Sequence, residues 1–154
     1  MRDFNEADKK KKRARIQIPD NPAGLPAEVL AHLEKSIKAS LKDGNLPCAR
    51  AFTIARDAGV PRIAIGDRTD KLGLRVINCQ IGCFKVDKTL HNDLEPGGVD
   101  DGLAGALKTL ADSGDLTCSR VFDLAQRTKQ PPMAVADAAN RLKMKIHSCQ
   151  LGCF

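Results

Sequence analysis

The chain has 154 residues, with 25 Lys or Arg against 19 Asp or Glu, and its net charge is +6. Apolar residues make up 42% and aromatic residues 3%, with no Trp or Tyr, so we expect an aliphatic core and no aromatic platform for stacking bases. Because no apolar run is long enough to span a bilayer and no secretory signal is evident, we expect a cytoplasmic protein with reduced thiols and no membrane partner.

Residues 1–24 predict a basic, disordered arm that ends in a short linker. Its basic residues are Lys9, Lys10, Lys11, Lys12, Arg13 and Arg15. Such an arm can add phosphate contacts that weaken as the salt concentration rises. The alternative is a solvated tail that only aids solubility.

Residues 25–84 predict three helices followed by an extended end. Apolar residues recur at helical spacing after Pro26, and a second helix is expected to start near Pro47 and to break at residues 59–61. Ile63 and Ile65 lie on the apolar stripe of the third helix. An extended segment then leads into residues 79–84, which we call the first hook.

The same unit occurs a second time, 70 residues later, after a linker at residues 85–101. Between residues 48–84 and 118–154 there are 13 identities in 37 ungapped positions, and all six cysteines belong to them. Residues 102–154 therefore form a second repeat, whose last six residues, 149–154, are the second hook. The expected fold is mainly α, with two tandem three-helix repeats that each end in a short extended Cys-rich hook.

The break between the second and third helix of each repeat resembles the helix-turn-helix of DNA-binding proteins, over residues 46–76 and 116–146. The extended end lies where winged-helix proteins place a short strand. This resemblance implies that Arg62 and Arg68 of the third helix contact phosphate or guanine in double-stranded DNA. The second repeat has Pro132 and Ala138 at these positions, so DNA is expected to bind mainly to the first repeat and the arm. Alternatively, any small three-helix domain has the same pattern.

The duplicated cysteines predict a thiolate site in each repeat. Helix starts lower the pKa of a thiol, and a spacing of three residues lets both cysteines of a hook face one point. The expected ligands are one set of three per repeat: Cys48, Cys79 and Cys83, and Cys118, Cys149 and Cys153. Three thiolates are one short of a closed zinc or iron–sulfur site. An iron–sulfur cluster with one open iron, or a zinc site completed by water, would fit either repeat, whereas His147 could complete a site in the second repeat only. Alternatively, the two repeats or the two chains of a homodimer could share ligands. Redox-active thiols and inert core cysteines are the alternatives.

Together these features predict a DNA-binding transcriptional regulator that senses metal or redox state through zinc or an iron–sulfur cluster. The alternative is a metal or iron–sulfur carrier, or an accessory module for a metalloenzyme, that does not bind DNA. A purely structural interaction domain is the third possibility. No phosphate loop or nucleophile–base pair occurs in both repeats, so no enzyme is expected.

Overall fold

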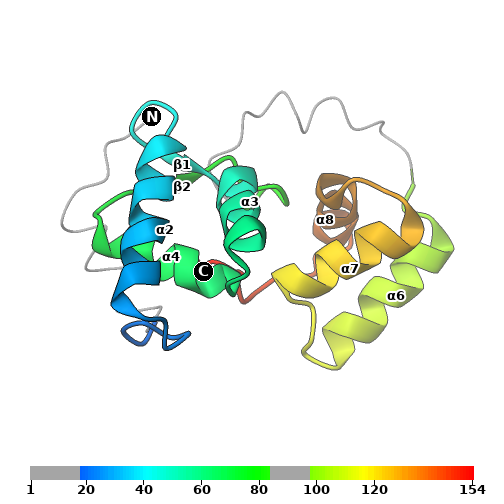
Figure 1. Ribbon diagram of the computed structural model, residues 1–154. Helices are drawn as coiled ribbons and strands as arrows, with labels where there is room; N and C mark the ends of the chain where they lie inside the picture. Colours follow the sequence, from blue (N-terminus) through cyan, green and yellow to red (C-terminus); the bar gives the residue numbers. More distant parts are fainter. Residues whose placement is uncertain (1–17, 84–97) are drawn as a thin grey trace. The chain divides into compact units, whose positions relative to one another are not determined.

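The computed structural model describes residues 18–83 and 98–154, and within them the prediction of a mainly helical fold is confirmed. These ranges contain six helices and one two-stranded sheet (Figure 1). None of these helices combines the length and the apolar character that crossing a membrane requires. The basic residues of the arm, most of the linker and Phe84 lie outside the described residues.

The chain divides into two compact units whose boundaries lie inside the hooks. Among the described residues, the first unit contains residues 18–77 and 150–154, and the second contains residues 78–83 and 98–149. Each hook was expected to belong to its own repeat. In the structure residues 79–83 of the first hook group with the second repeat, and residues 150–154 of the second hook group with the first.

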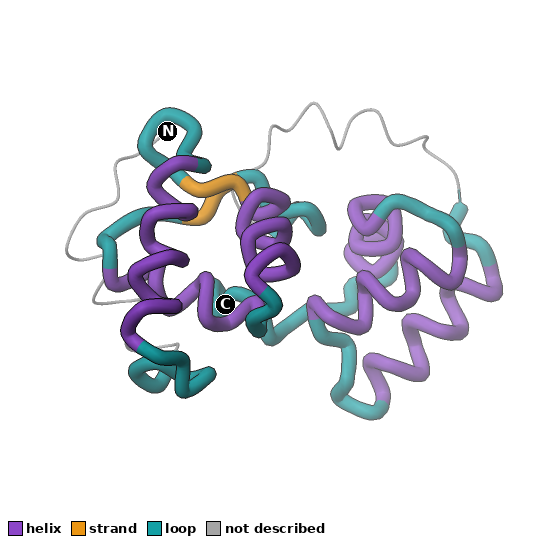
Figure 2. Tube along the Cα trace, in the orientation of Figure 1, coloured by secondary structure: helices purple, strands orange, loops and turns teal. Residues whose placement is uncertain are grey.

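In the first unit, a short parallel strand pair closes a two-helix segment (Figure 2). Leu46 pairs with Val76 and Pro47 with Ile77, so the end of the segment returns to its beginning. The elements in chain order are α2 (Ala27–Ala39), β1 (Leu46–Pro47), α3 (Cys48–Ala58), α4 (Arg62–Lys71) and β2 (Val76–Ile77).

The second unit repeats this arrangement at an offset of 70 residues. Thr117 and His147 form a parallel bridge, at the positions equivalent to Pro47 and Ile77. The amide of His147 donates to the carbonyl of Leu116 at 3.1 Å, and the amide of Cys118 donates to the carbonyl of His147 at 3.0 Å. The helices are α6 (Asp101–Asp112), α7 (Cys118–Thr128) and α8 (Pro132–Arg141).

The two cores use equivalent positions, because apolar side chains recur at the same helical and strand positions in both repeats. Five core residues of each unit occupy equivalent positions on the three helices and on the segment before the second helix, and each is at most 4% exposed. They are Leu33, Ile37, Leu46, Ala51 and Ile65 in the first unit and Leu103, Leu107, Leu116, Val121 and Val135 in the second.

Each break between the second and third helix is fixed by backbone conformation. α3 ends at Gly59 with φ of 64°, and α7 ends at Lys129 with φ of 53°, both in the left-handed region that turns the chain out of a helix. Pro61 and Pro131 then precede the next helices and favour an extended residue before them. The breaks predicted at these positions are therefore present.

Candidate thiolate site

The strand-like bridge of the second unit brings two cysteines of one repeat together at the start of α7. Cys118 is the first residue of α7 and is 4% exposed. Its amide is bonded to the carbonyl of His147, and Cys149 follows His147 by only two residues. The bridge therefore carries half-buried Cys149 to the neighbourhood of Cys118.

The first hook supplies two more cysteines to the same unit. The amide of Gly82 donates to the carbonyl of Cys79 at 3.0 Å, and Gly82 has φ of 72°, so the hook turns tightly between its cysteines. Ile81 is 3% exposed and anchors the hook. Cys79 is buried, whereas Cys83 is exposed.

The pKa of the Cys83 thiol is shifted by the neighbouring cysteines. A hydrogen bond with the thiol of Cys79, partial desolvation, and charge repulsion from Cys79, Cys118 and Cys149 all raise the pKa of Cys83 above its ordinary value. The thiols of Cys79, Cys118 and Cys149, from three segments distant in sequence, therefore all lie near enough to Cys83 to disfavour its thiolate. Each of them belongs to the second unit.

These sulfurs do not converge on a single point. Over residues 18–83 and 98–154, no group of three or more His, Cys, Asp or Glu side chains is arranged to hold a metal ion. The donor set nevertheless fits a thiolate metal centre in kind and number, because four Cys ligands close a tetrahedral zinc site or an iron–sulfur cluster. Binding would require the sulfurs to move closer together.

The set of three thiols per repeat expected from the sequence stays a prediction. Beside Cys83 the structure places Cys118 and Cys149 of the second repeat, in addition to Cys79 of the same hook. The physical reason is that the chain passes from one unit to the other at residues 77–78 and again at 149–150.

The remaining cysteines, Cys48 and Cys153, belong to the first unit. Cys48 is the first residue of α3 and is buried, and Cys153 is half-buried. The ring of His147 lies within 3.0 Å of the carbonyl oxygen of Gly114 and within 2.8 Å of the hydroxyl of Ser148. These contacts occupy both of its ring nitrogens.

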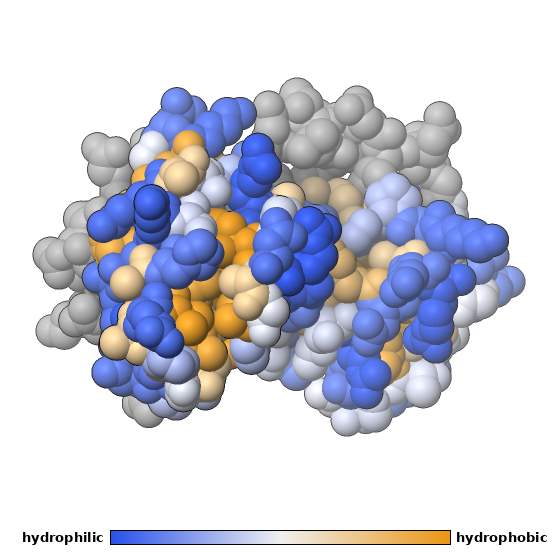
Figure 3. Space-filling model, in the orientation of Figure 1, coloured by the Kyte–Doolittle hydropathy of each residue, from blue (hydrophilic) through white to orange (hydrophobic). Residues whose placement is uncertain are grey.

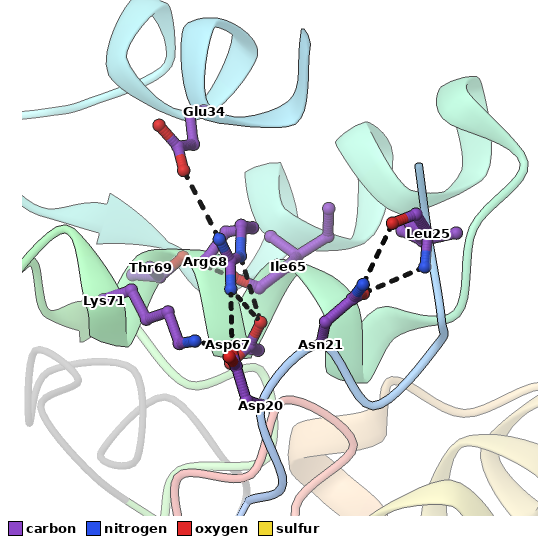
Figure 4. A network of polar contacts seen from close by, with 9 residues as sticks. All are labelled: Asp20, Asn21, Leu25, Glu34, Ile65, Asp67, Arg68, Thr69 and Lys71. Carbon is purple, nitrogen blue, oxygen red and sulfur yellow. Dashed lines mark hydrogen bonds and ion pairs between the residues drawn. The ribbon is translucent and has the colours of Figure 1, made fainter. Parts of the chain in front are cut away.

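The guanidinium of Arg68 lies inside a polar network of the first unit (Figure 4). Arg68 is 8% exposed and donates to the carboxylate of Asp67 at 2.7 and 3.0 Å. Its guanidinium also forms ion pairs of 3.5 Å with Glu34 and with Asp20, which in turn pairs with Lys71. Arg68 therefore serves the packing of α4 in this structure, and its expected DNA contact stays a prediction.

Arg62 is also engaged within the first unit. Its guanidinium carbon lies 3.8 Å from the centre of the Phe52 ring, and the guanidinium donates to the side-chain oxygen of Gln150 at 2.5 Å. Gln150 belongs to the second hook, so this contact joins the C-terminal segment to α4. The DNA contact expected of Arg62 stays a prediction.

The raised pKa of Cys83 predicts how the stability of the metal-free protein depends on pH. Below pH 9.0, the ordinary pKa of this thiol, both folded and unfolded chains keep the proton and Cys83 contributes no pH dependence. Above it, the unfolded chain loses the proton while the folded chain retains it, so stability falls. Thermal unfolding of reduced, metal-free protein between pH 8 and 10.5 should show this fall, and it should be smaller in Cys83→Ser. An equal fall in both proteins would contradict the assignment.

Comparisons with known proteins found no similar protein. No protein-family model, no curated protein and no solved structure matches the chain.

Proposed function

We propose that the second unit is a metal-binding module in which Cys79, Cys83, Cys118 and Cys149 hold zinc or an iron–sulfur cluster. The observation that supports it is the gathering of four thiols, from a hook, a helix start and a bridge, around Cys83. Thiolates that disfavour the ionisation of Cys83 can be held together with it when a cation offsets their charge. Zinc and iron–sulfur clusters both take this donor set.

The metal function is better supported than the redox-active thiols considered as an alternative. The thiolate, not the thiol, attacks oxidants and disulfides. The raised pKa of Cys83 keeps it protonated at neutral pH, so in the absence of metal it is a poor nucleophile. The same crowding that suppresses reactivity provides the donors for a metal ion.

A site with four protein ligands has no open position for a substrate, so its role is to hold the fold or to report metal availability. Its ligands come from the first hook, the start of α7 and the first residue of the second hook. Metal binding would therefore fix three segments that are distant in sequence. This favours a structural or sensing module over catalysis.

Metal analysis of reduced protein purified without oxygen tests the proposal. We expect at least one metal equivalent per chain; a colourless zinc protein and a brown iron–sulfur protein distinguish the two candidates. Because thiols must lose protons to bind metal, zinc affinity measured against a competing chelator should increase as pH rises. Protein that binds neither zinc nor a reconstituted cluster, with six freely titrating thiols, would refute the proposal.

Binding of double-stranded DNA is the second candidate, and the helix arrangement supports it. α3 and α4, like α7 and α8, are separated by a three-residue break as in a helix-turn-helix. Arg50 and Arg56 of α3 are exposed, and Arg56 also pairs with Asp57 at 3.0 Å. Retention on duplex DNA that falls steeply with rising salt, and that weakens in Arg62→Ala, would support this candidate; no retention at low salt would exclude it.

A further inference from the structure

The second hook ends against the face of α4 in the first unit. Leu151 is 1% exposed, and Gly66 in the middle of α4 lies directly against its backbone. A β-carbon at Gly66 would collide with the carbonyl oxygen of Leu151 and would lie 2.7 Å from its carbonyl carbon. Only glycine permits this approach.

The neighbouring residue of the hook is enclosed as tightly. Gly152 has φ of 69°, and a β-carbon there would collide with the side chain of Ile18 and would lie 3.1 Å from the δ-carbon of Ile63. Figure 3 shows hydrophobic residues gathered on this face of the first unit, around the position of the C-terminus. Together with the hydrogen bond from Arg62 to Gln150, these contacts form a binding site for residues 150–154 on the first unit, which we call the seat.

The seat is specific to the first unit. The positions equivalent to Arg62 and Gly66 are Pro132 and Ala136, which offer neither a guanidinium nor a bare backbone. The residues that receive the segment therefore differ between the repeats although the hooks are nearly identical in sequence.

We infer that residues 150–154 form a latch seated on α4, and that seating of the latch and metal binding by Cys149 favour one another. The second part rests on the proposed function. Cys149 is joined to Gln150 by one peptide bond, so fixing either residue restricts the conformations of the other and lowers the entropy cost of fixing it. By linkage, a change that unseats the latch weakens metal binding by the same factor by which metal loss weakens the latch.

Seating of the latch also determines whether one face of α4 is covered. A seated latch covers Gly66 and holds the guanidinium of Arg62, so metal loss would uncover this face and free that guanidinium. The thiolate site would thereby control access to the helix that resembles a recognition helix.

Gly66→Ala tests the latch with a change of one methyl group, to the residue that the second repeat has at this position. We expect amide hydrogen exchange of residues 151–154 to become faster, and zinc affinity to fall by roughly fivefold to a hundredfold. Gly105→Ala is the matched control, because a β-carbon at this glycine of α6 meets nothing within 4 Å, and both measurements should be unchanged. Leu151→Asp serves as a second variant in case Gly66→Ala destabilises α4 itself. It leaves the sequence of α4 unchanged, and it should also make exchange of residues 151–154 faster and lower zinc affinity.

The outcomes separate the two proposals. Wild-type exchange at residues 151–154 in both variants would overturn the latch, whatever metal is bound. Faster exchange with unchanged zinc affinity would overturn the linkage. A wild-type chain that binds no metal would refute the proposed function, and the exchange measurement on metal-free protein would still test the latch.

Discussion

Cys118→Ser is expected to weaken zinc binding more than a hundredfold. Binding energies of structural zinc sites are on the order of 10–16 kcal/mol shared among four ligands, so one thiolate contributes about 3 kcal/mol. Cys118 is buried at the start of α7, where the slightly smaller serine fits but provides no soft sulfur donor. Zinc affinity should be measured by competition with a chromophoric chelator under reducing conditions.

Cys48→Ser is the matched control. Cys48 occupies the same position at the start of α3 and is equally buried, but it belongs to the first unit. This variant should still bind one metal ion with affinity close to that of the wild type. If Cys118→Ser binds zinc as tightly as the wild type, or if Cys48→Ser loses all binding, the assigned ligand set is incorrect.

Arg68→Ala is expected to destabilise the protein by roughly 3–5 kcal/mol. The substitution leaves the carboxylate of Asp67, which is 4% exposed, without the guanidinium that neutralises it, and an uncompensated buried charge costs this much. It also removes the ion pairs with Glu34 and Asp20. Urea unfolding of metal-free protein measures the loss directly.

Arg141→Ala provides the control in the second unit. Arg141 pairs with Asp137, the residue equivalent to Asp67, but across one turn of helix and with both side chains partly exposed. Such a pair contributes only about 0.3–0.5 kcal/mol. Equal losses in Arg68→Ala and Arg141→Ala would contradict a structural role for the buried network.

These two arginine variants also bear on DNA binding. If Arg68 acts only in stabilising the fold, Arg68→Ala protein that remains folded should be retained on duplex DNA as strongly as the wild type. A selective loss of retention with unchanged stability would instead support the contact expected from the helix-turn-helix resemblance. Stability and retention must therefore be measured on the same preparation.

The sequence by itself determined the local features of this protein. The 70-residue offset, the helix starts after Pro47 and Thr117, and the breaks before Pro61 and Pro131 all follow from short-range patterns and backbone restrictions. A mainly helical fold with cysteines at helix starts and in hooks was predictable for the same reason. These properties depend on residues within a few positions of one another.

Which cysteines lie close together depends on the tertiary structure alone. The two hooks have almost the same sequence, so no local pattern distinguishes a hook that folds onto its own repeat from one that crosses to the other. Nor did any pattern show that Arg68 is buried against Asp67, because a basic residue on a helix reads the same whether it faces solvent or a carboxylate. The choice depends on packing between segments far apart in the sequence, such as the fit of Leu151 against the bare backbone of Gly66.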